Sequence, residues 1–176
     1  MIFIPTELAG ATIVDLERRG DDRGFFARTF CKREFEAHGL PGDMVQTNLS
    51  WSKHKGTLRG MHYQLAPHAE AKLVRCTHGA IYDVIVDIRP DSPTFCRWIG
   101  VELSDSNFRM LLVPQGFAHG FITLTDDVMV TYQVSQFYTP NAERGARHND
   151  PAFAIAWPAA VTVQSDKDRN WPDFRT

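Results

Sequence analysis

The stretch Val113-Pro114-Gln115-Gly116-Phe117-Ala118-His119 is the most informative part of this sequence for the architecture of the chain. It has the pattern P-x-G-x-x-H and lies between two short apolar runs, Met110–Val113 and Gly120–Leu124. Proline and glycine mark turns, and the two runs have the length and composition of β-strands. The pattern therefore indicates a turn between two strands, with a histidine close to it.

Strand-like runs of this kind recur along the whole sequence. Many are rich in Val, Ile, Thr, Phe and Tyr, which favour strands, and 12 glycines and 10 prolines punctuate the chain between them. Besides the two runs above, the predicted strands are Gly24–Phe30, Val45–Ser50, Thr57–Gln64, Ala71–Thr77, Ala80–Ile88, Trp98–Leu103 and Val128–Phe137. One short helix is predicted at Lys32–His38, with Gly39 as its stop.

So many short strands with hardly any helix predict an all-β protein, built as a sandwich, jelly roll or barrel. The length of 176 residues predicts one domain, residues 1–176. His78-Gly79 indicates a tight hairpin turn, because glycine supplies the positive φ that such a turn needs. Period-2 alternation places Tyr132, Val134, Gln136 and Tyr138 on one face of a single strand.

Composition excludes several classes of partner. The formal net charge is −2, without the basic excess of a protein that binds nucleic acid or an anionic membrane. Three cysteines at wide spacing fit neither a CxxC motif nor an even-numbered disulfide framework. The N-terminus, Met1–Glu7, has no basic or apolar signal-peptide region, and no segment has the length of a membrane span. We expect a cytoplasmic protein.

The P-x-G-x-x-H stretch is similar to the second motif of cupin jelly-roll barrels, whose histidine projects into the barrel. The first cupin motif carries His-x-His followed by Glu, and these residues bind a metal together with the second-motif histidine. Here the first motif reads His62-Tyr63-Gln64, and Lys72 follows in the next strand. Loss of a histidine ligand and addition of an ammonium weaken a divalent-metal site. We therefore expect a cupin-like barrel without metal.

A more specific resemblance extends over nearly the whole chain. The blocks that carry it, in order, are Arg23-Gly24-Phe25-Phe26, Gln46-Thr47-Asn48, Gly56-Thr57-Leu58-Arg59-Gly60-Met61-His62-Tyr63-Gln64, Lys72-Leu73-Val74, Val113-Pro114-Gln115-Gly116-Phe117-Ala118-His119-Gly120-Phe121 and Ser165-Asp166-Lys167-Asp168. Together they resemble the dTDP-4-dehydrorhamnose 3,5-epimerase family. No single block is specific, but six in the same order make a chance match improbable.

This resemblance implies a reaction without any cofactor. The family's substrate is a nucleotide-linked 4-keto-6-deoxy hexose, in which the C4 ketone acidifies the hydrogens on C3 and C5. Epimerisation then requires a base on one face of the sugar, an acid on the other, and a cation or donor that stabilises the enolate. The resemblance leaves open whether C3, C5 or both are inverted, and which nucleotide base the substrate carries.

The resemblance also assigns the catalytic residues. His62 matches the base, and an imidazole, with an unperturbed pKa of about 6.5, can accept a proton near neutral pH. Asp168 matches the carboxylate that orients this histidine. Lys72 matches the cation that stabilises the enolate, and Tyr132 matches the proton donor on the opposite face.

Further residues match contacts to the ligand. Arg23 and Arg59 match the pyrophosphate contacts, since guanidinium groups bind phosphate oxygens in a bidentate manner. Tyr138 matches the residue that stacks on the nucleotide base. The remaining matches are Gln46, Asn48, His119, Glu143 and Lys167. Strict alternation would place Arg59 and His62 on opposite faces of their strand, and a bulge at Gly60 would reconcile them.

The chain departs from the family pattern at two positions. Glu70 stands where glutamine is usual, and His148 replaces a tryptophan before Asn149-Asp150-Pro151. The resemblance implies a homodimer with exchanged N-terminal strands, and Met1-Ile2-Phe3-Ile4 is a candidate for such a strand. Two alternatives to the epimerase remain: a metal-dependent cupin dioxygenase or isomerase, and a non-catalytic sugar-binding cupin. The first would retain iron, and the second would not exchange protons of a ketosugar with solvent.

Overall fold

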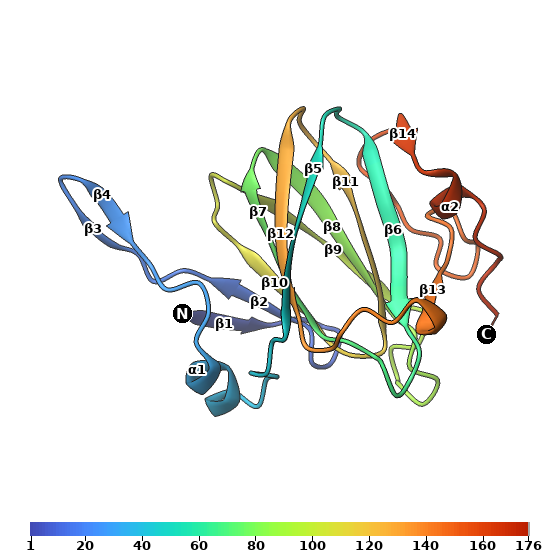
Figure 1. Cartoon of the computed structure of the whole chain (residues 1–176), viewed down its shortest axis with the longest axis horizontal. Helices are drawn as coiled ribbons and strands as arrows, with labels where there is room; N and C mark the ends of the chain where they lie inside the picture. The colour runs from blue at the N-terminus through green and yellow to red at the C-terminus, as the bar shows by residue number, and fades with distance from the viewer. Residues whose placement is uncertain (176) are drawn as a thin grey trace.

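Two antiparallel sheets face each other in the computed structural model, which describes residues 1–175 (Figure 1). The first sheet contains, in spatial order, β1 (Ile2–Pro5), β2 (Thr12–Asp15), β10 (Met110–Val113), β7 (Lys72–His78), β12 (Val128–Val134) and β5 (Gln46–Ser52). The second contains β13 (Glu143–Gly145), β6 (Thr57–Gln64), β11 (Phe117–Thr123), β8 (Ala80–Asp87) and β9 (Trp98–Ser104), and β14 (Val163–Gln164) pairs with β6 in parallel. The other elements are the hairpin of β3 (Arg19–Asp21) and β4 (Gly24–Phe26), the helices α1 (Lys32–Ala37) and α2 (Asp166–Arg169), and the 3-10 helix η1 (Pro140–Ala142). The expectation of an all-β fold with one or two short helices is confirmed.

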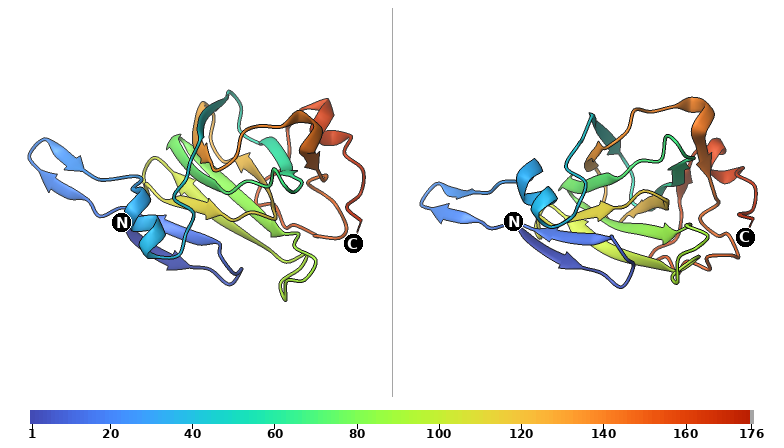
Figure 2. Two further views of the ribbon diagram at one scale, coloured as in Figure 1. Left: turned by 60° about the horizontal axis from the view of Figure 1, so that its bottom comes forward. Right: turned by 90° about the horizontal axis from the view of Figure 1, so that it is seen from below.

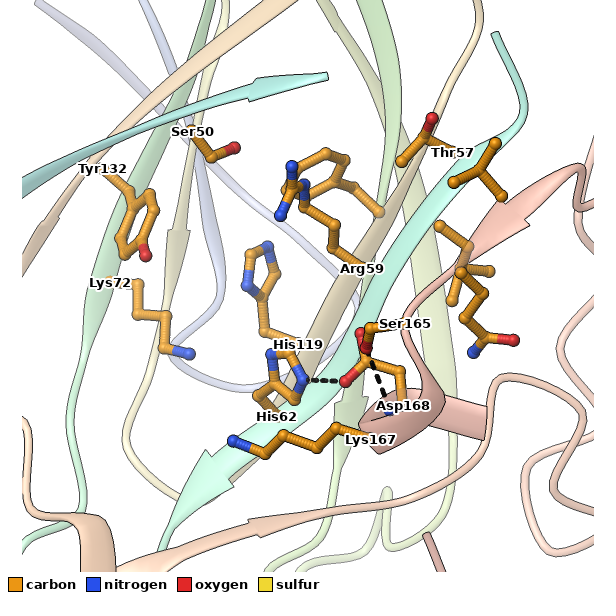
Figure 3. Close-up of a pocket in the computed structure, with 14 residues that line it drawn as sticks. Ser50, Thr57, Arg59, His62, Lys72, His119, Tyr132, Ser165, Lys167 and Asp168 are labelled. Carbon is orange, nitrogen blue, oxygen red and sulfur yellow. Dashed lines mark hydrogen bonds and ion pairs between the residues drawn. The ribbon is translucent and has the colours of Figure 1, made fainter. Parts of the chain in front are cut away.

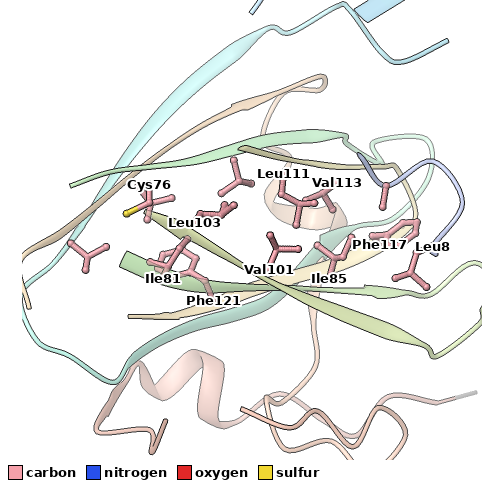
Figure 4. Packing of buried hydrophobic residues seen from close by; sticks show 14 residues of the cluster. Leu8, Cys76, Ile81, Ile85, Val101, Leu103, Leu111, Val113, Phe117 and Phe121 are labelled. Atoms are coloured by element: carbon pink, nitrogen blue, oxygen red, sulfur yellow. The ribbon is translucent and has the colours of Figure 1, made fainter. Parts of the chain in front are cut away.

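The space between the two sheets is apolar over much of its length. Alternate side chains of β7, β8, β10 and β12 point inward and form a buried cluster that includes Val74, Ile85, Leu111 and Val130 (Figure 4). The inward positions are polar at Lys72, which begins β7, and along β5 and β6, which lie at or next to an edge of their sheets. Apolar burial therefore stabilises the sandwich between its inner strands, and a polar cavity lies on the side between β5 and β6.

Two smaller clusters cover the outer faces of the sheets. On the first sheet, Phe35 of α1 packs against Val14 and Met110. On the second, residues that follow β13, among them Phe153, pack against Val84 and related side chains. Among residues 1–175, neither helix has the length or the hydropathy required to cross a membrane.

The β3–β4 hairpin projects away from the two sheets (Figure 2). The predicted strand Gly24–Phe30 is wrong beyond Phe26, because β4 pairs with β3 alone and β3 has three residues. With no further partner strand, the ladder ends at the pair Arg19 and Phe26. Arg23 lies in the turn of this hairpin, where its side chain is 89% exposed.

The predicted hairpin at His78-Gly79 is also wrong, although a tight turn is present. Gly79 has the expected positive φ of 74°, and a Cβ atom there would lie 2.5 Å from Thr125 Oγ1. The strands on either side nevertheless belong to different sheets, since β7 pairs with β10 and β12 while β8 pairs with β9 and β11. The turn carries the chain from one sheet to the other.

The strand predicted at Val128–Phe137 ends at Val134, so Gln136 and Tyr138 do not continue the face that carries Tyr132. Side-chain amides replace the strand ladder here. Gln46 Oε1 accepts the N–H of Tyr138 at 2.8 Å, and Gln64 Oε1 accepts the N–H of Thr139 at 2.7 Å. These bonds turn the segment away from the sheet and across the mouth of the barrel.

The remaining differences concern the bounds of elements. The helix predicted at Lys32–His38 is one residue shorter in the structure. It ends at Ala37, and Gly39 follows with a φ of 70°. The strand predicted at Gly120–Leu124 begins three residues earlier, at Phe117. The prediction did not include β2, β3, β13 and β14, which have between two and four residues each. The candidate exchanged strand Met1–Ile4 lies largely in β1, which pairs here with β2 of the same chain.

Candidate active site

Two adjoining cavities of about 500 and 340 Å³ open between the sheets, on the side formed by β5 and β6. His62, Lys72 and Tyr132 line both of them, so they form one continuous site. Figure 3 shows the larger cavity. The structure brings together nearly all of the predicted site residues. Those in the walls are Gln46, Asn48, Arg59, His62, Lys72, His119, Tyr132, Tyr138, Glu143, Lys167 and Asp168.

His62 and Asp168 form a hydrogen-bonded pair in one wall of the site. His62 Nε2 lies 2.6 Å from Asp168 Oδ1, and the other carboxylate oxygen accepts the N–H of Gly60 at 3.1 Å. Burial acts to raise the pKa of Asp168, but the hydrogen bond and the charge of His62, together with the Gly60 N–H, outweigh it and hold this pKa below its usual range. The ionised carboxylate orients the ring and leaves Nδ1 to accept a proton.

The position of Asp168 follows from its local sequence. Ser165 caps the N-terminus of α2, and its Oγ accepts the N–H of Asp168 at 3.1 Å. This cap begins the helical turn next to β6 and directs the buried Asp168 side chain towards His62. Asp168, which lies close to the C-terminal end of the chain, is thereby brought into contact with His62, which precedes it by 106 residues.

The predicted bulge in β6 is confirmed. His62 pairs with His119 and Arg59 pairs with Phe121, so Gly60 and Met61 together oppose one residue of β11. Gly60 has a φ of 119°, and a Cβ atom there would lie 2.6 Å from the backbone of β11. The extra residue restores Arg59 and His62 to the same side of the strand, and both line the larger cavity.

The opposite wall of the site carries Tyr132 and Lys72, on the neighbouring strands β12 and β7. Figure 3 shows both side chains entering the cavity from the side that faces His62. Burial, and after it the charge of Glu70, raise the pKa of Tyr132, although Arg59 acts in the other direction. The phenol therefore keeps its proton at neutral pH and is suited to donate it.

Three residues at the mouth of the site form a linked group. Glu143 accepts hydrogen bonds from Lys167 Nζ at 2.6 Å and from the Tyr138 hydroxyl at 2.8 Å. Burial acts to raise the pKa of Glu143, but these two bonds lower it below its usual range. Tyr138 is 57% exposed and lines the smaller cavity.

Arg59 and His119 are each oriented by hydrogen bonds to residues that are not among the predicted site residues. Arg59 donates to Ser52 Oγ at 3.0 Å and to the Trp51 carbonyl at 2.9 Å, which directs its guanidinium across the cavity from β6 to β5. His119 Nε2 lies 2.7 Å from the fully buried carboxylate of Asp83. The site thus contains a second imidazole with a fixed orientation.

Among the residues that were not predicted from the sequence are two polar side chains, Ser50 in the wall of the larger cavity and Asp83 behind His119. Ser50 lines the larger cavity, and its buried Oγ has no hydrogen-bond partner in the described part of the chain. Its spacing of two residues from Asn48 on the same strand was an available signal. Asp83, a carboxylate within the apolar run from Ile81 to Val86, was the other.

Arg23 is the predicted ligand contact that the fold leaves apart. At the tip of the β3–β4 hairpin it pairs with Asp21, at 3.1 Å between Nε and Oδ1, and it lines neither cavity as described over residues 1–175. The sequence block around Arg23 therefore does not complete the site within one chain.

The first-motif position that would hold a metal ligand has another use here. Gln64 accepts the Thr139 N–H through Oε1, and its Nε2 donates to the His68 carbonyl at 2.9 Å and to Glu70 at 3.1 Å. In residues 1–175 no group of three or more His, Cys, Asp or Glu side chains is arranged to hold a metal ion. The hydrogen bonds of Gln64 therefore join Thr139 at the mouth of the site to Glu70 in its wall.

Comparison with known proteins gives a consistent result. Residues 5–176 match the family model described as dTDP-4-dehydrorhamnose 3,5-epimerase. The chain is 46% identical to the dTDP-4-dehydrorhamnose 3,5-epimerase of Shigella flexneri, over 99% of this chain and 96% of that protein.

Solved structures of such epimerases share the whole architecture. One from Bacillus anthracis, with TDP and PPi bound, has a TM-score of 0.95 and 45% identity, and covers 98% of this chain and 99% of that one. One from Legionella pneumophila, in complex with dTDP-4-keto-L-rhamnose, has a TM-score of 0.89 and 38% identity over 99% of both chains. The expected cupin-like fold is confirmed by these similarities.

Proposed function

Because the chain belongs to the dTDP-4-dehydrorhamnose 3,5-epimerase family, an isomerase family of dTDP-rhamnose biosynthesis, we propose that His62, Tyr132, Lys72 and Asp168 carry out its reaction. The substrate is a nucleotide-linked 4-keto-6-deoxy hexose, and we assign it dTDP as the nucleotide and inversion at both C3 and C5. The observation that supports these roles best is the placement of His62 and Tyr132 on facing sheets. A sugar ring between the two sheets presents one face to each.

The proposed mechanism needs no cofactor. His62 removes the proton from a carbon next to the C4 ketone, and the electron pair of the broken C–H bond moves to the ketone oxygen to form an enolate. The ammonium of Lys72 stabilises the charge on that oxygen. Tyr132 then donates its proton to the same carbon from the opposite face, which inverts the configuration.

Deuterium incorporation tests this function directly. The purified protein is incubated with dTDP-4-keto-6-deoxyglucose in deuterated water, and NMR follows C3, C5 and the configuration of the product. We expect solvent deuterium at both carbons with inversion. A non-catalytic sugar-binding protein would bind the compound and leave both hydrogens in place, and a metal-dependent enzyme would lose its activity after treatment with a chelator.

The nucleotide is proposed to lie across the mouth of the site. Tyr138 offers an aromatic face for the base, and Arg59 offers a guanidinium to the pyrophosphate. Gln46, Asn48, His119, Glu143 and Lys167 complete the contacts to the ligand. Support comes from their placement around one continuous cavity.

Arg59→Ala is expected to weaken the binding of dTDP by roughly ten- to a hundredfold, since a hydrogen bond to a charged group contributes about 1.5–3 kcal/mol. Calorimetric titration with dTDP measures this change. Arg97→Ala is the matched control, because Arg97 is exposed and lines neither described cavity. Equal affinity in Arg59→Ala and the parent would place the pyrophosphate elsewhere.

We further propose that the protein is a homodimer, formed through the outer face of the first sheet. On this face Leu49 and Trp51 of β5 are 63% and 52% exposed, and Met129 of β12 lies beside them. Arg75 Nε and Gln133 Oε1 are buried there without partners in the described residues. Such a face is unfavourable in water and suits a second copy, which would deliver Arg23 of the partner subunit to the site.

Leu49→Glu is therefore expected to convert a dimer, of twice the chain mass of 20.0 kDa, into a monomer. Light scattering after gel filtration measures the mass. Glu102→Lys, on the exposed side of β9, is the control and should leave the dimer intact. A parent protein that is itself monomeric would contradict the proposed dimer.

We place the enzyme in the cytoplasm, where a reducing environment suits its three free cysteines.

A further inference from the structure

Glu70 and Lys72 form an ion pair inside the site that the mechanism above does not use. Glu70 Oε1 lies 3.1 Å from Lys72 Nζ, and both side chains are nearly buried, with exposed fractions of 12% and 9%. A buried ammonium is costly unless a charge or hydrogen-bond partner compensates it. Glu70 supplies that charge directly beside the group that meets the enolate.

Gln64 fixes the position of the Glu70 carboxylate. The amide of Gln64 can adopt only one orientation without losing bonds, because its oxygen accepts the Thr139 N–H and its nitrogen donates to the His68 carbonyl. That orientation turns an N–H towards Glu70 Oε2, at 3.1 Å. Position 70 therefore faces two donors, the amide of Gln64 and the ammonium of Lys72.

A carboxylate satisfies both donors, whereas a glutamine at this position would not. A glutamine has one acceptor oxygen, and its NH₂ group would face either the amide of Gln64 or the ammonium of Lys72. The glutamate of this chain therefore fits the two donors that face position 70. The same carboxylate raises the pKa of Tyr132, so it also favours the protonated phenol on the same wall.

We propose that Glu70 is a positioning residue that holds the Lys72 ammonium towards the C4 oxygen of the substrate. Lysine has a long flexible side chain that binds as a point charge, and the Glu70–Gln64 bracket restricts it to one place. Because the ammonium has three donors, one can contact Glu70 while the others remain available to the enolate. This inference rests on the proposed function, since it assigns Glu70 a part in the same reaction.

The test compares Glu70→Gln with the parent in three measurements: kcat and KM for epimerisation, affinity for dTDP, and the midpoint of thermal unfolding. We expect kcat to fall about ten- to a hundredfold, the loss of one hydrogen bond to a charged group. KM and the Kd of dTDP should stay within about twofold. Glu102→Gln, on an exposed strand position, is the matched control and should change none of these values.

The other results each overturn the inference. An unchanged kcat would mean that Lys72 needs no support, and a higher kcat would mean that the carboxylate mainly cancels its charge. A loss of dTDP affinity or thermal stability parallel to the loss of kcat would mean that Glu70 serves the segment around Thr139 or the fold. Glu70→Ala gives the same comparison if the glutamine variant does not fold. Failure of the proposed function itself is recognised separately, because the parent would then exchange no deuterium.

Discussion

Replacing His62 with Asn is expected to stop both deuterium exchange and epimerisation. The imidazole of His62 is the proposed base, and Asn preserves much of its size and polarity without the capacity to take a proton from the substrate. Loss of a general base costs about 10²- to 10⁴-fold in rate. NMR of the ketosugar in deuterated water measures exchange at each carbon, and binding of dTDP should remain close to that of the parent.

Two further variants make this result specific. His54→Asn alters an exposed histidine that lines neither cavity over the described residues, and it should exchange at the parent rate. Asp168→Asn should lie between the two, because His62 survives but loses the carboxylate at 2.6 Å that sets its tautomer. Parent-rate exchange in His62→Asn would identify another residue as the base.

The strands of the sandwich were predictable because their pattern is local. The runs that became β6 and β10 match their predicted bounds, since strand-like composition and a flanking glycine or proline, Gly56 before β6 and Pro114 after β10, are local features of the sequence. Pairing between strands is not local. The glycine at position 79 predicted a tight turn with a positive φ. Whether the two strands that it joins pair in a hairpin or belong to different sheets depends on partner strands far along the chain.

The candidate site shows the same division. His62, Lys72 and Tyr132 were found through a family resemblance, and the fold then placed them around one cavity. The bulge at Gly60 could be predicted because two requirements conflicted on one strand. Asp83 was missed, because its role is to contact His119, 2.7 Å away on an adjacent strand, and the pairing of those strands is not visible in the sequence. Arg23 stays apart for a different reason, since its proposed place depends on a second chain.

Tyr132→Phe is expected to separate exchange from inversion, because it removes the acid and keeps the base. His62 can still remove a proton, and Lys72 can still hold the enolate. The proton that returns from the His62 side restores the original configuration, now with deuterium from solvent. The phenyl ring keeps the shape of the wall, so dTDP should bind as before.

Inversion should therefore fall about 10²- to 10⁴-fold in Tyr132→Phe, while exchange stays within about tenfold of the parent. The same NMR experiment gives both numbers, from the deuterium content of the recovered substrate and the amount of epimerised product. The facing walls of the sandwich make this outcome possible, since β12 and β6 approach the sugar from opposite sides. Full inversion without the phenol would show that water or another residue protonates that face, and equal loss of exchange and inversion would assign Tyr132 a part in forming the enolate.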